Sequence, residues 1–324
     1  MTGLRIRTPS RLHFGLLGWG SRATRQFGGV GLMVEDPGIE IRLEPGPEWG
    51  FSGPLSARVR DLVSGMLDGE GRPGLPGLGP ARIEVVSAAP EHSGLGVGTQ
   101  LSLAVVHGLL LLAGEPPPPP ELLAGLTGRG RRSGVGLHGF GRGGLIVDAG
   151  RSDESGPPCL VAQSPFPEDW AILLVSPPGP RGRHGSEESR SFAELTPPPD
   201  RVTERLCRLI LLGILPALAE RDLPAFGAAV SLNSSGTSRG VRAAPGGALR
   251  QPLAEAIVAE LGRIGLVGAG QSSWGPTLYA FSRAEDSERE RIRARIAESF
   301  GLDRSSLRWT RAANRGAIVE RLDA

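Results

Sequence analysis

Alternating apolar and polar positions in the N-terminal third of the chain predict a set of β-strands. Residues 4–8, 39–43 and 82–87 alternate with a period of two, which is typical of half-buried strands. Residues 9–17 and 27–34 are two further extended segments. The strand at 82–87 leads into a glycine loop and then into an unbroken apolar run. The expected order there is strand, loop and buried helix.

The second half of the chain predicts another set of helices and strands. A buried strand at 170–178 opens it, and a small-residue loop at 265–281 feeds into another strand. Apolar periodicity predicts helices in four places, at 201–221, 223–232, 252–264 and 284–299. A last strand is expected at 306–311.

Composition narrows the class of protein. A chain of 324 residues is long enough for two domains, and we place the boundary between 165 and 166. A net charge of +2 argues against nucleic-acid binding. Cys159 and Cys207 are too few for a disulfide framework, and the longest apolar run is too short to span a bilayer. We therefore expect a cytoplasmic protein with no membrane segment.

The glycine loop at 90–100 suits an anionic ligand. Gly94, Gly96 and Gly98 let the backbone approach a phosphate, and the start of the following helix favours negative charge. Thr99 would cap this helix or bind the phosphate. A Walker loop is excluded because the chain contains no Lys, and the spacing G-x-G-x-G does not fit the dinucleotide fingerprint. The alternative is a glycine-rich turn before a buried helix.

Two more segments carry candidate chemistry. The glycine-rich stretch at 128–148 contains Arg129, Arg131, Arg132 and Arg142, whose guanidinium groups suit a polyanion, although an exposed basic loop is the alternative. Arg11 and His13 lie two residues apart and would share one face of a strand. Such a pair is also common on a solvated face, but the neighbouring glycines favour a pocket.

Several segments together resemble the GHMP kinase superfamily of small-molecule kinases. The combination also resembles one branch in particular, the beta-ribofuranosylaminobenzene 5'-phosphate synthase family of methanopterin biosynthesis. The matching segments are Arg11-Leu-His-Phe-Gly15, Gly94-Leu-Gly-Val-Gly-Thr-Gln100, Arg132-Ser-Gly-Val-Gly136, Gly143-Gly-Leu-Ile-Val-Asp148 and Gly270-Gln-Ser-Ser-Trp-Gly-Pro276. The resemblance implies an α+β, two-domain GHMP-kinase-like fold. Its N-terminal domain would be ribosomal protein S5 domain 2-like and would bind phosphate, and its C-terminal domain would be ferredoxin-like.

One departure from the superfamily pattern favours the branch over the kinases. Kinases of this superfamily often carry an Asp that serves phosphoryl transfer, and the matching position here is Gly136. The phosphate loop is kept while this carboxylate is missing. A phosphate-bearing substrate used for a reaction other than phosphoryl transfer fits this combination.

The resemblance implies condensation of 5-phosphoribosyl 1-diphosphate with 4-aminobenzoate or 4-hydroxybenzoate, with release of CO2 and diphosphate. The residues alone leave the two acceptors open. Two alternatives also stay open. One is an ATP-dependent GHMP-type kinase, and the other is a relative that binds the phosphoribosyl compound without turning it over.

Site roles follow from the same resemblance. Catalysis is expected from Arg11, His13, Arg132 and Ser133. Phosphate binding is expected from Gly94, Leu95, Gly96, Val97, Gly98, Thr99 and Gln100. Substrate binding is expected from Gln26, Gln271, Ser272, Ser273 and Trp274, although a core position is the alternative for Trp274. Mg²⁺ is the expected cofactor, with Asp148, Glu187 and Glu188 as ligands, and a turn cap is the alternative for Asp148. A homodimer would fit the family.

Overall fold

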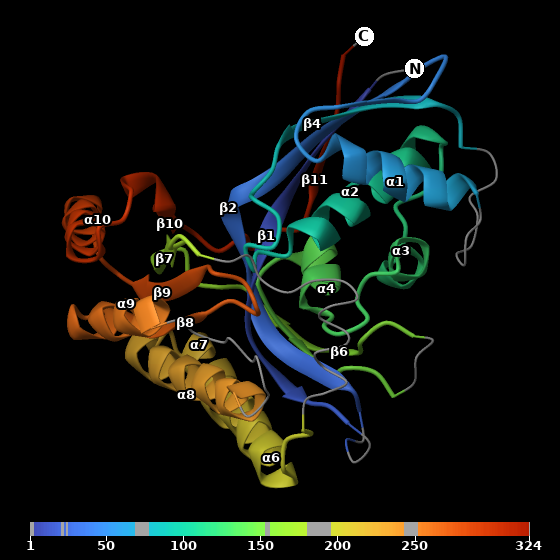
Figure 1. The fold of residues 1–324 in the computed structure, drawn as a ribbon. Helices are drawn as coiled ribbons and strands as arrows, with labels where there is room; N and C mark the ends of the chain where they lie inside the picture. The colour runs from blue at the N-terminus through green and yellow to red at the C-terminus, as the bar shows by residue number, and fades with distance from the viewer. Residues whose placement is uncertain are drawn as a thin grey trace.

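A seven-stranded sheet forms the first half of the molecule (Figure 1). The computed structural model describes residues 3–20, 23, 25–68, 78–152, 156–179, 196–242 and 252–323. The sheet contains β1 (Leu4–Gly18), β2 (Phe27–Pro45), β3 (Gly50–Ser52), β4 (Ala81–Ser87), β5 (Leu145–Asp148), β6 (Leu160–Ser164) and β11 (Ile318–Arg321). The N-terminal segments predicted as four strands form two long ones, β1 and β2. Register shifts between Thr8 and Ser10 and between His13 and Gly15 keep β1 paired to β2 across the interruptions in its pattern.

Four helices lie together on one side of this sheet (Figure 1). They are α1 (Ser56–Leu67), α2 (Val97–Leu112), α3 (Pro120–Thr127) and α4 (Val135–Arg142). Helix α2 is buried along most of its length, which explains its nearly unbroken apolar sequence. Gly108 lets α2 approach β2, because a Cβ there would lie 2.8 Å from Leu43 Cδ1. The predicted helix after the glycine loop is confirmed.

A four-stranded antiparallel sheet forms the second half, with strand order β10-β7-β9-β8. Its strands are β7 (Ala171–Val175), β8 (Val267–Gln271), β9 (Leu278–Ser282) and β10 (Leu307–Thr310). Its helical segments are α6 (Asp200–Leu209), a π-helical turn (Ile210–Ile214), α7 (Leu215–Ala219), α8 (Leu223–Arg242), α9 (Pro252–Arg263) and α10 (Asp286–Phe300). A short 3₁₀ turn (Arg304–Ser306) precedes β10. None of the helices in the described ranges is long and apolar enough to cross a membrane.

The start of the predicted small-residue loop at 265–281 is wrong, because Val267–Gln271 is strand β8. Small residues are needed there for packing rather than for a turn. A Cβ on Gly227 of α8 would lie 2.4 Å from Val267 Cβ, so the helix and the strand approach as closely as glycine allows. A Cβ on Gly268 of β8 would lie 3.3 Å from Gly227 Cα, and glycine in a strand marks such a close approach.

The two halves share an aromatic contact and a strand. Phe14 of β1 packs against Tyr279 and Phe281 of β9, with ring centroids 5.0 and 6.0 Å apart. Strand β11 returns from the second half to pair with β1, Leu4 opposite Arg321, and places the chain ends near each other (Figure 1). The sequence does not predict β11. The boundary at 165/166 stays a prediction.

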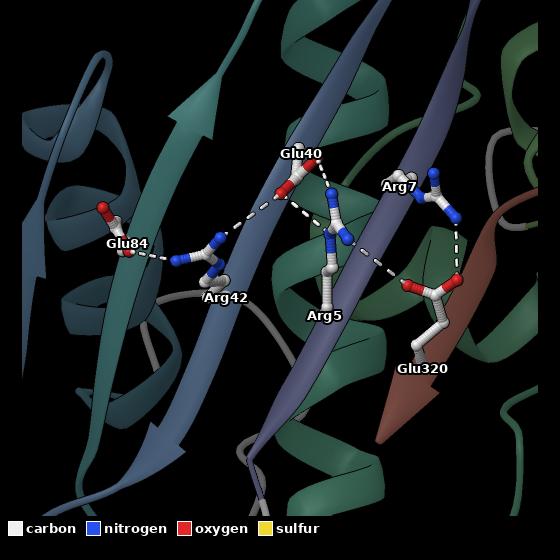
Figure 2. Close-up of polar contacts among 6 residues, drawn as sticks. All are labelled: Arg5, Arg7, Glu40, Arg42, Glu84 and Glu320. Atoms are coloured by element: carbon white, nitrogen blue, oxygen red, sulfur yellow. Dashed lines mark hydrogen bonds and ion pairs between the residues drawn. The ribbon is translucent and has the colours of Figure 1, made fainter. Parts of the chain in front are cut away.

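Ion pairs cover one face of the first sheet (Figure 2). Arg5 holds Glu40 with two hydrogen bonds of 2.8 Å, which lower the pKa of this carboxyl group, and Arg7 pairs with Glu320 at 2.7 Å. Arg42 lies within 4.0 Å of Glu40 and 3.9 Å of Glu84. Arg5, Arg7 and Arg42 therefore each lie within 4.0 Å of a carboxylate on this face.

The close contact between α8 and β8 predicts that Gly227→Ala destabilises the protein. The new methyl group would overlap Val267, and overpacking of this kind costs about 1–3 kcal/mol. Urea unfolding would measure the loss. The matched control is Gly65→Ala in α1, where no atom lies within 4 Å of the new Cβ. That variant should be more stable by up to about 1 kcal/mol. Equal stabilities for the two variants would contradict the packing argument.

Candidate active site

Three segments that are far apart in sequence meet beside β1. The Arg11 N–H donates to the Leu95 carbonyl at 2.9 Å. The His13 N–H donates to Ser272 Oγ at 3.0 Å, and Ser272 Oγ donates to the Gly94 carbonyl at 2.7 Å. The predicted strand pair, the predicted phosphate loop and the Gln-Ser-Ser-Trp segment are therefore brought together.

Glycines at this junction allow backbone to touch backbone. A Cβ on Gly275 would lie 2.1 Å from the Gly94 nitrogen, and a Cβ on Gly94 would lie 2.3 Å from the Ser272 carbonyl oxygen. Gly94 also has a φ of +88°, which side chains rarely adopt. The sequence assigned Gly94 to phosphate binding from the spacing of the glycines alone. Its contact with the C-terminal half is a second reason why a glycine occupies this position.

Helix α2 begins at Val97 and points its N-terminus into this junction. Its N-cap is Gly96, with a φ of +73° and no side-chain hydrogen bond at the cap. The prediction that Thr99 caps the helix is therefore wrong, because the helix begins two residues earlier. The positive end of the helix dipole remains available to an anion.

Arginines from three elements surround the first turns of α2. A Cβ on Gly96 would lie 3.4 Å from Arg11 Nε, and a Cβ on Gly98 would lie 2.6 Å from Arg58 Nη2. Arg129 Nη2 donates to Ser102 Oγ at 3.3 Å. The predicted phosphate loop therefore has guanidinium groups beside two of its glycines, and this arrangement favours a polyanion.

Arg58 is a functional candidate that the sequence pattern missed. It lies on α1 and forms an ion pair with Glu91, which belongs to the glycine loop. Within the described part of the chain its Nε is buried and has no hydrogen-bond partner. The sequence contains no signal that would place an arginine of α1 over Gly98. Only tertiary packing brings them together.

The second glycine-rich stretch is partly a helix rather than a loop. Helix α4 occupies Val135–Arg142, and Gly139 brings it against β2, because a Cβ there would lie 2.2 Å from Met33 Sδ. Gln100 Nε2 donates to the Gly136 carbonyl at 2.7 Å, so α4 starts beside the start of α2. Arg132 lies partly buried just before this helix. The two predicted anion-binding stretches are neighbours in space.

A buried hydrogen-bonded row lies behind this junction. His13 Nε2 lies 3.1 Å from Ser133 Oγ, and Ser133 Oγ donates to Asp148 Oδ2 at 3.3 Å. Burial and the nearby positive charge of Arg11 lower the pKa of His13 to about 3, so its ring is neutral at neutral pH. Burial raises the pKa of Asp148 to about 6, although N–H donors from Gly150 and Gly134 and the Ser133 hydroxyl oppose the rise.

The remaining predicted substrate residues have mixed positions. Gln271 Nε2 donates to the Gly275 carbonyl at 2.8 Å and shapes the loop, while Trp274 is partly buried in it. Ser273 has a φ of +55°, and its N–H donates to the His13 carbonyl at 3.3 Å. Gln26 instead exchanges hydrogen bonds with the backbone of Gly20 at 2.9 and 3.0 Å.

The described carboxylates do not fit a protein-held metal ion. In the described ranges no three His, Cys, Asp or Glu side chains are grouped as a metal site. Asp148 has no exposed surface, and both of its oxygens accept hydrogen bonds, from Gly134, Gly150 and Ser133. This geometry matches the turn-cap alternative. Glu187 and Glu188 lie outside the described residues.

The fold defines the structural class of this protein, which is GHMP-kinase-like. Residues 214–302 match the family described as GHMP kinases C terminal. The chain superposes on a homoserine kinase from Cytophaga hutchinsonii with a TM-score of 0.68 at 14% identity, covering 99% of this chain and 98% of that chain. For mevalonate diphosphate decarboxylase from Staphylococcus aureus the TM-score is 0.63 at 14% identity, with 98% of each chain covered. The predicted α+β fold is confirmed.

Within this class, the chain belongs to the beta-ribofuranosylphenol 5'-phosphate synthase family. It is 34% identical over 340 residues to the protein of that name from Methanothermobacter thermautotrophicus, covering 98% of both chains. It is 34% identical over 333 residues to the one from Archaeoglobus fulgidus, covering 98% of this chain and 99% of that relative. The family predicted from the motifs is confirmed. The relatives are named for a phenol, whereas the motifs were matched to the aminobenzene name.

The buried, neutral His13 predicts a loss of stability in acid. Its folded-state pKa of about 3 lies below the ordinary value of 6.5, so its contribution is present above pH 6.5 and is lost as the pH falls toward 3. Between pH 7 and 4.5 the wild type should lose about 2–3 kcal/mol more stability than His13→Gln. Urea unfolding at both pH values measures the difference. The pKa of Asp148 shifts in the opposite direction, but Asp148 is present in both proteins and does not account for the difference between them. Parallel pH profiles would contradict a neutral, buried His13.

The position of Arg58 predicts that Arg58→Met weakens anion binding. We expect the Arg58 guanidinium to bond to phosphate oxygens, so its loss should raise the Kd for inorganic diphosphate about 10- to 100-fold. Isothermal titration calorimetry would measure the Kd. Arg60→Met is the matched control, since Arg60 is exposed two residues along the same helix and lies over the Phe51 ring. Equal effects of the two variants would show that only overall charge matters.

Proposed function

We propose that this chain catalyses the synthase reaction for which its family is named. The reaction would join C1 of 5-phosphoribosyl 1-diphosphate to the ring of a 4-substituted benzoate, with release of CO2 and diphosphate. The observation that carries the proposal is 34% identity over nearly the full length of two synthases. A ribofuranosylphenol keeps a ring hydroxyl, so 4-hydroxybenzoate is the favoured acceptor and 4-aminobenzoate the second.

The bond changes of this reaction balance without a base. The C1–O bond to diphosphate breaks, and its electron pair leaves with the diphosphate. The ring carbon that bears the carboxylate bonds to C1. The bond from that carbon to the carboxylate then breaks, its electrons restore the aromatic ring, and CO2 leaves. No proton has to be removed from the nucleophile.

The absence of a carboxylate at position 136 agrees with this chemistry. A kinase that activates a hydroxyl group benefits from a carboxylate near it. At Gly136 an added Cβ would meet Thr99 Cγ2 at 3.4 Å, an ordinary contact, so a Cβ would fit at this position. A transferase whose nucleophile is a ring carbon has no use for that group.

Positive charge at the start of α2 supports departure of diphosphate. Arg11 and Arg58 lie beside Gly96 and Gly98, and the helix N-terminus adds its dipole. Fixed donors aimed at developing negative charge lower the barrier for the leaving group. We assign the 94–100 loop, Arg11 and Arg58 to the diphosphate, and Arg132 to the phosphoribosyl group. His13, neutral in its buried position, would adjoin the sugar or the ring.

We propose that Mg²⁺ binds together with the substrate. The described carboxylates do not form a site for it, whereas diphosphate oxygens are ligands that Mg²⁺ prefers. We also propose that the protein is cytoplasmic and forms a homodimer.

Labelled CO2 release tests this function. Purified protein is incubated with Mg²⁺, 5-phosphoribosyl 1-diphosphate and carboxyl-labelled 4-hydroxybenzoate or 4-aminobenzoate. We expect release that requires the phosphoribosyl compound, is independent of ATP, is greater with 4-hydroxybenzoate and falls in Arg132→Ala.

Three outcomes would point elsewhere. Consumption of ATP in the presence of small alcohols, without CO2 release, would identify a kinase. Binding of 5-phosphoribosyl 1-diphosphate without turnover of either benzoate would identify a non-catalytic relative. Greater release with 4-aminobenzoate would reverse the order of the acceptors.

A further inference from the structure

Asp148 is a buried carboxylate for which the reaction above has no use. It ends β5, has no exposed surface and lies next to the start of α4. A charged group without solvent is costly unless it is hydrogen-bonded. Gly134 N–H donates to Oδ2 at 2.9 Å and Gly150 N–H donates to Oδ1 at 3.0 Å. These two hydrogen bonds are sufficient to stabilise the buried carboxylate. The third hydrogen bond, from the Ser133 hydroxyl, needs a separate explanation.

The Ser133 hydroxyl has one proton, and its partners determine where that proton points. The Val135 N–H donates to Ser133 Oγ at 3.2 Å, and Asp148 Oδ2 can only accept while the carboxylate is ionised. The hydroxyl proton therefore points to Asp148. The 3.1 Å contact with His13 Nε2 then requires a proton on that nitrogen.

We propose that Asp148 is a positioning residue which, through Ser133, holds His13 as its Nε2–H tautomer and leaves Nδ1 unprotonated. The tautomer of a histidine is set by the hydrogen bond that its other nitrogen makes. Gly29 makes room for this arrangement, because a Cβ there would lie 2.9 Å from His13 Nε2. The low pKa of His13 agrees with a ring that stays neutral while it is held in this way.

The consequence for the substrate rests on the proposed function. An unprotonated Nδ1 can accept a hydrogen bond and cannot donate one. His13 shares a face of β1 with Arg11, which lies beside the 94–100 loop. We therefore assign Nδ1 as the acceptor for a substrate hydroxyl group, either on the ribose or on the phenol ring.

Nitrogen-15 NMR of histidine-labelled protein tests the proposal directly. The wild type should show His13 protonated on Nε2. Ser133→Ala removes the link while leaving the Gly134 and Gly150 bonds to Asp148 in place, and the Nδ1–H form should then appear. In Asp148→Asn the amide nitrogen can donate to Ser133 only from the position of Oδ2, where the hydrogen bond from Gly134 is lost; this reverses the row and favours Nδ1–H. Ser133→Thr keeps the hydroxyl and should restore the wild-type tautomer.

His138 serves as an internal control in the same spectra. It is buried, and its Nε2 lies 2.7 Å from the Pro158 carbonyl, so its Nε2–H tautomer is fixed independently of Ser133. Its signals should not change in any variant. If the labelled CO2 assay is active, kcat should fall about 10- to 100-fold in Ser133→Ala, the loss of one well-placed hydrogen bond, with a smaller change in KM.

The tautomer of His13 decides the proposal whatever the activity. An Nδ1–H form in the wild type, or an unchanged Nε2–H form in Ser133→Ala, would overturn it. Ser133→Ala alone is sufficient for the decision if Asp148→Asn does not fold. The expected tautomer shift without CO2 release in the wild type would leave the positioning role standing and refute the synthase function.

Discussion

The hydroxyl group of Ser272 joins the parts of this molecule on which the site depends. It is fully buried, accepts the N–H of His13 at 3.0 Å and donates to the carbonyl of Gly94 at 2.7 Å. One side chain thus satisfies a backbone donor of β1 and a backbone acceptor of the 94–100 loop. A buried backbone group without a partner costs roughly 1–3 kcal/mol, so other arrangements of the three segments are disfavoured.

This contact places the site at the junction of the two sheets. On one face of β1, Arg11 lies beside the loop that starts α2, and on the other, Phe14 packs against Tyr279 of the second sheet. The long strand is therefore covered on both sides near His13. Gly275 is required at the junction because its Cβ would overlap the Gly94 nitrogen. Binding elements from both halves are consequently held with little freedom relative to one another.

The sequence pattern predicted which helices and strands form better than it predicted which of them pack together. The periodicity of 82–113 is sufficient for a strand, a loop and a buried helix, and these were found as β4, the glycine loop and α2. Strands β6 and β11 were missed, since each is short and is stabilised by its neighbours rather than by its own alternation. At the site, strand spacing pointed to His13 and the family resemblance to Ser133, as separate candidates. Their contact with each other, and that of Arg58 with Gly98, arise only from tertiary packing.

The electrostatics of the site agrees with the proposed transfer to a carbon atom on a kinase-like fold. The two carboxylates described at the site both have partners, Glu91 with Arg58 and Asp148 with Ser133 and two backbone N–H groups. The guanidinium groups of Arg11 and Arg58 lie beside the first turn of α2, while His13 is neutral. A site of this kind stabilises a departing diphosphate without presenting a base to a hydroxyl nucleophile. Leaving position 136 without a carboxylate and enclosing the one at 148 in hydrogen bonds would together shift the same scaffold from phosphoryl transfer to transfer of the sugar.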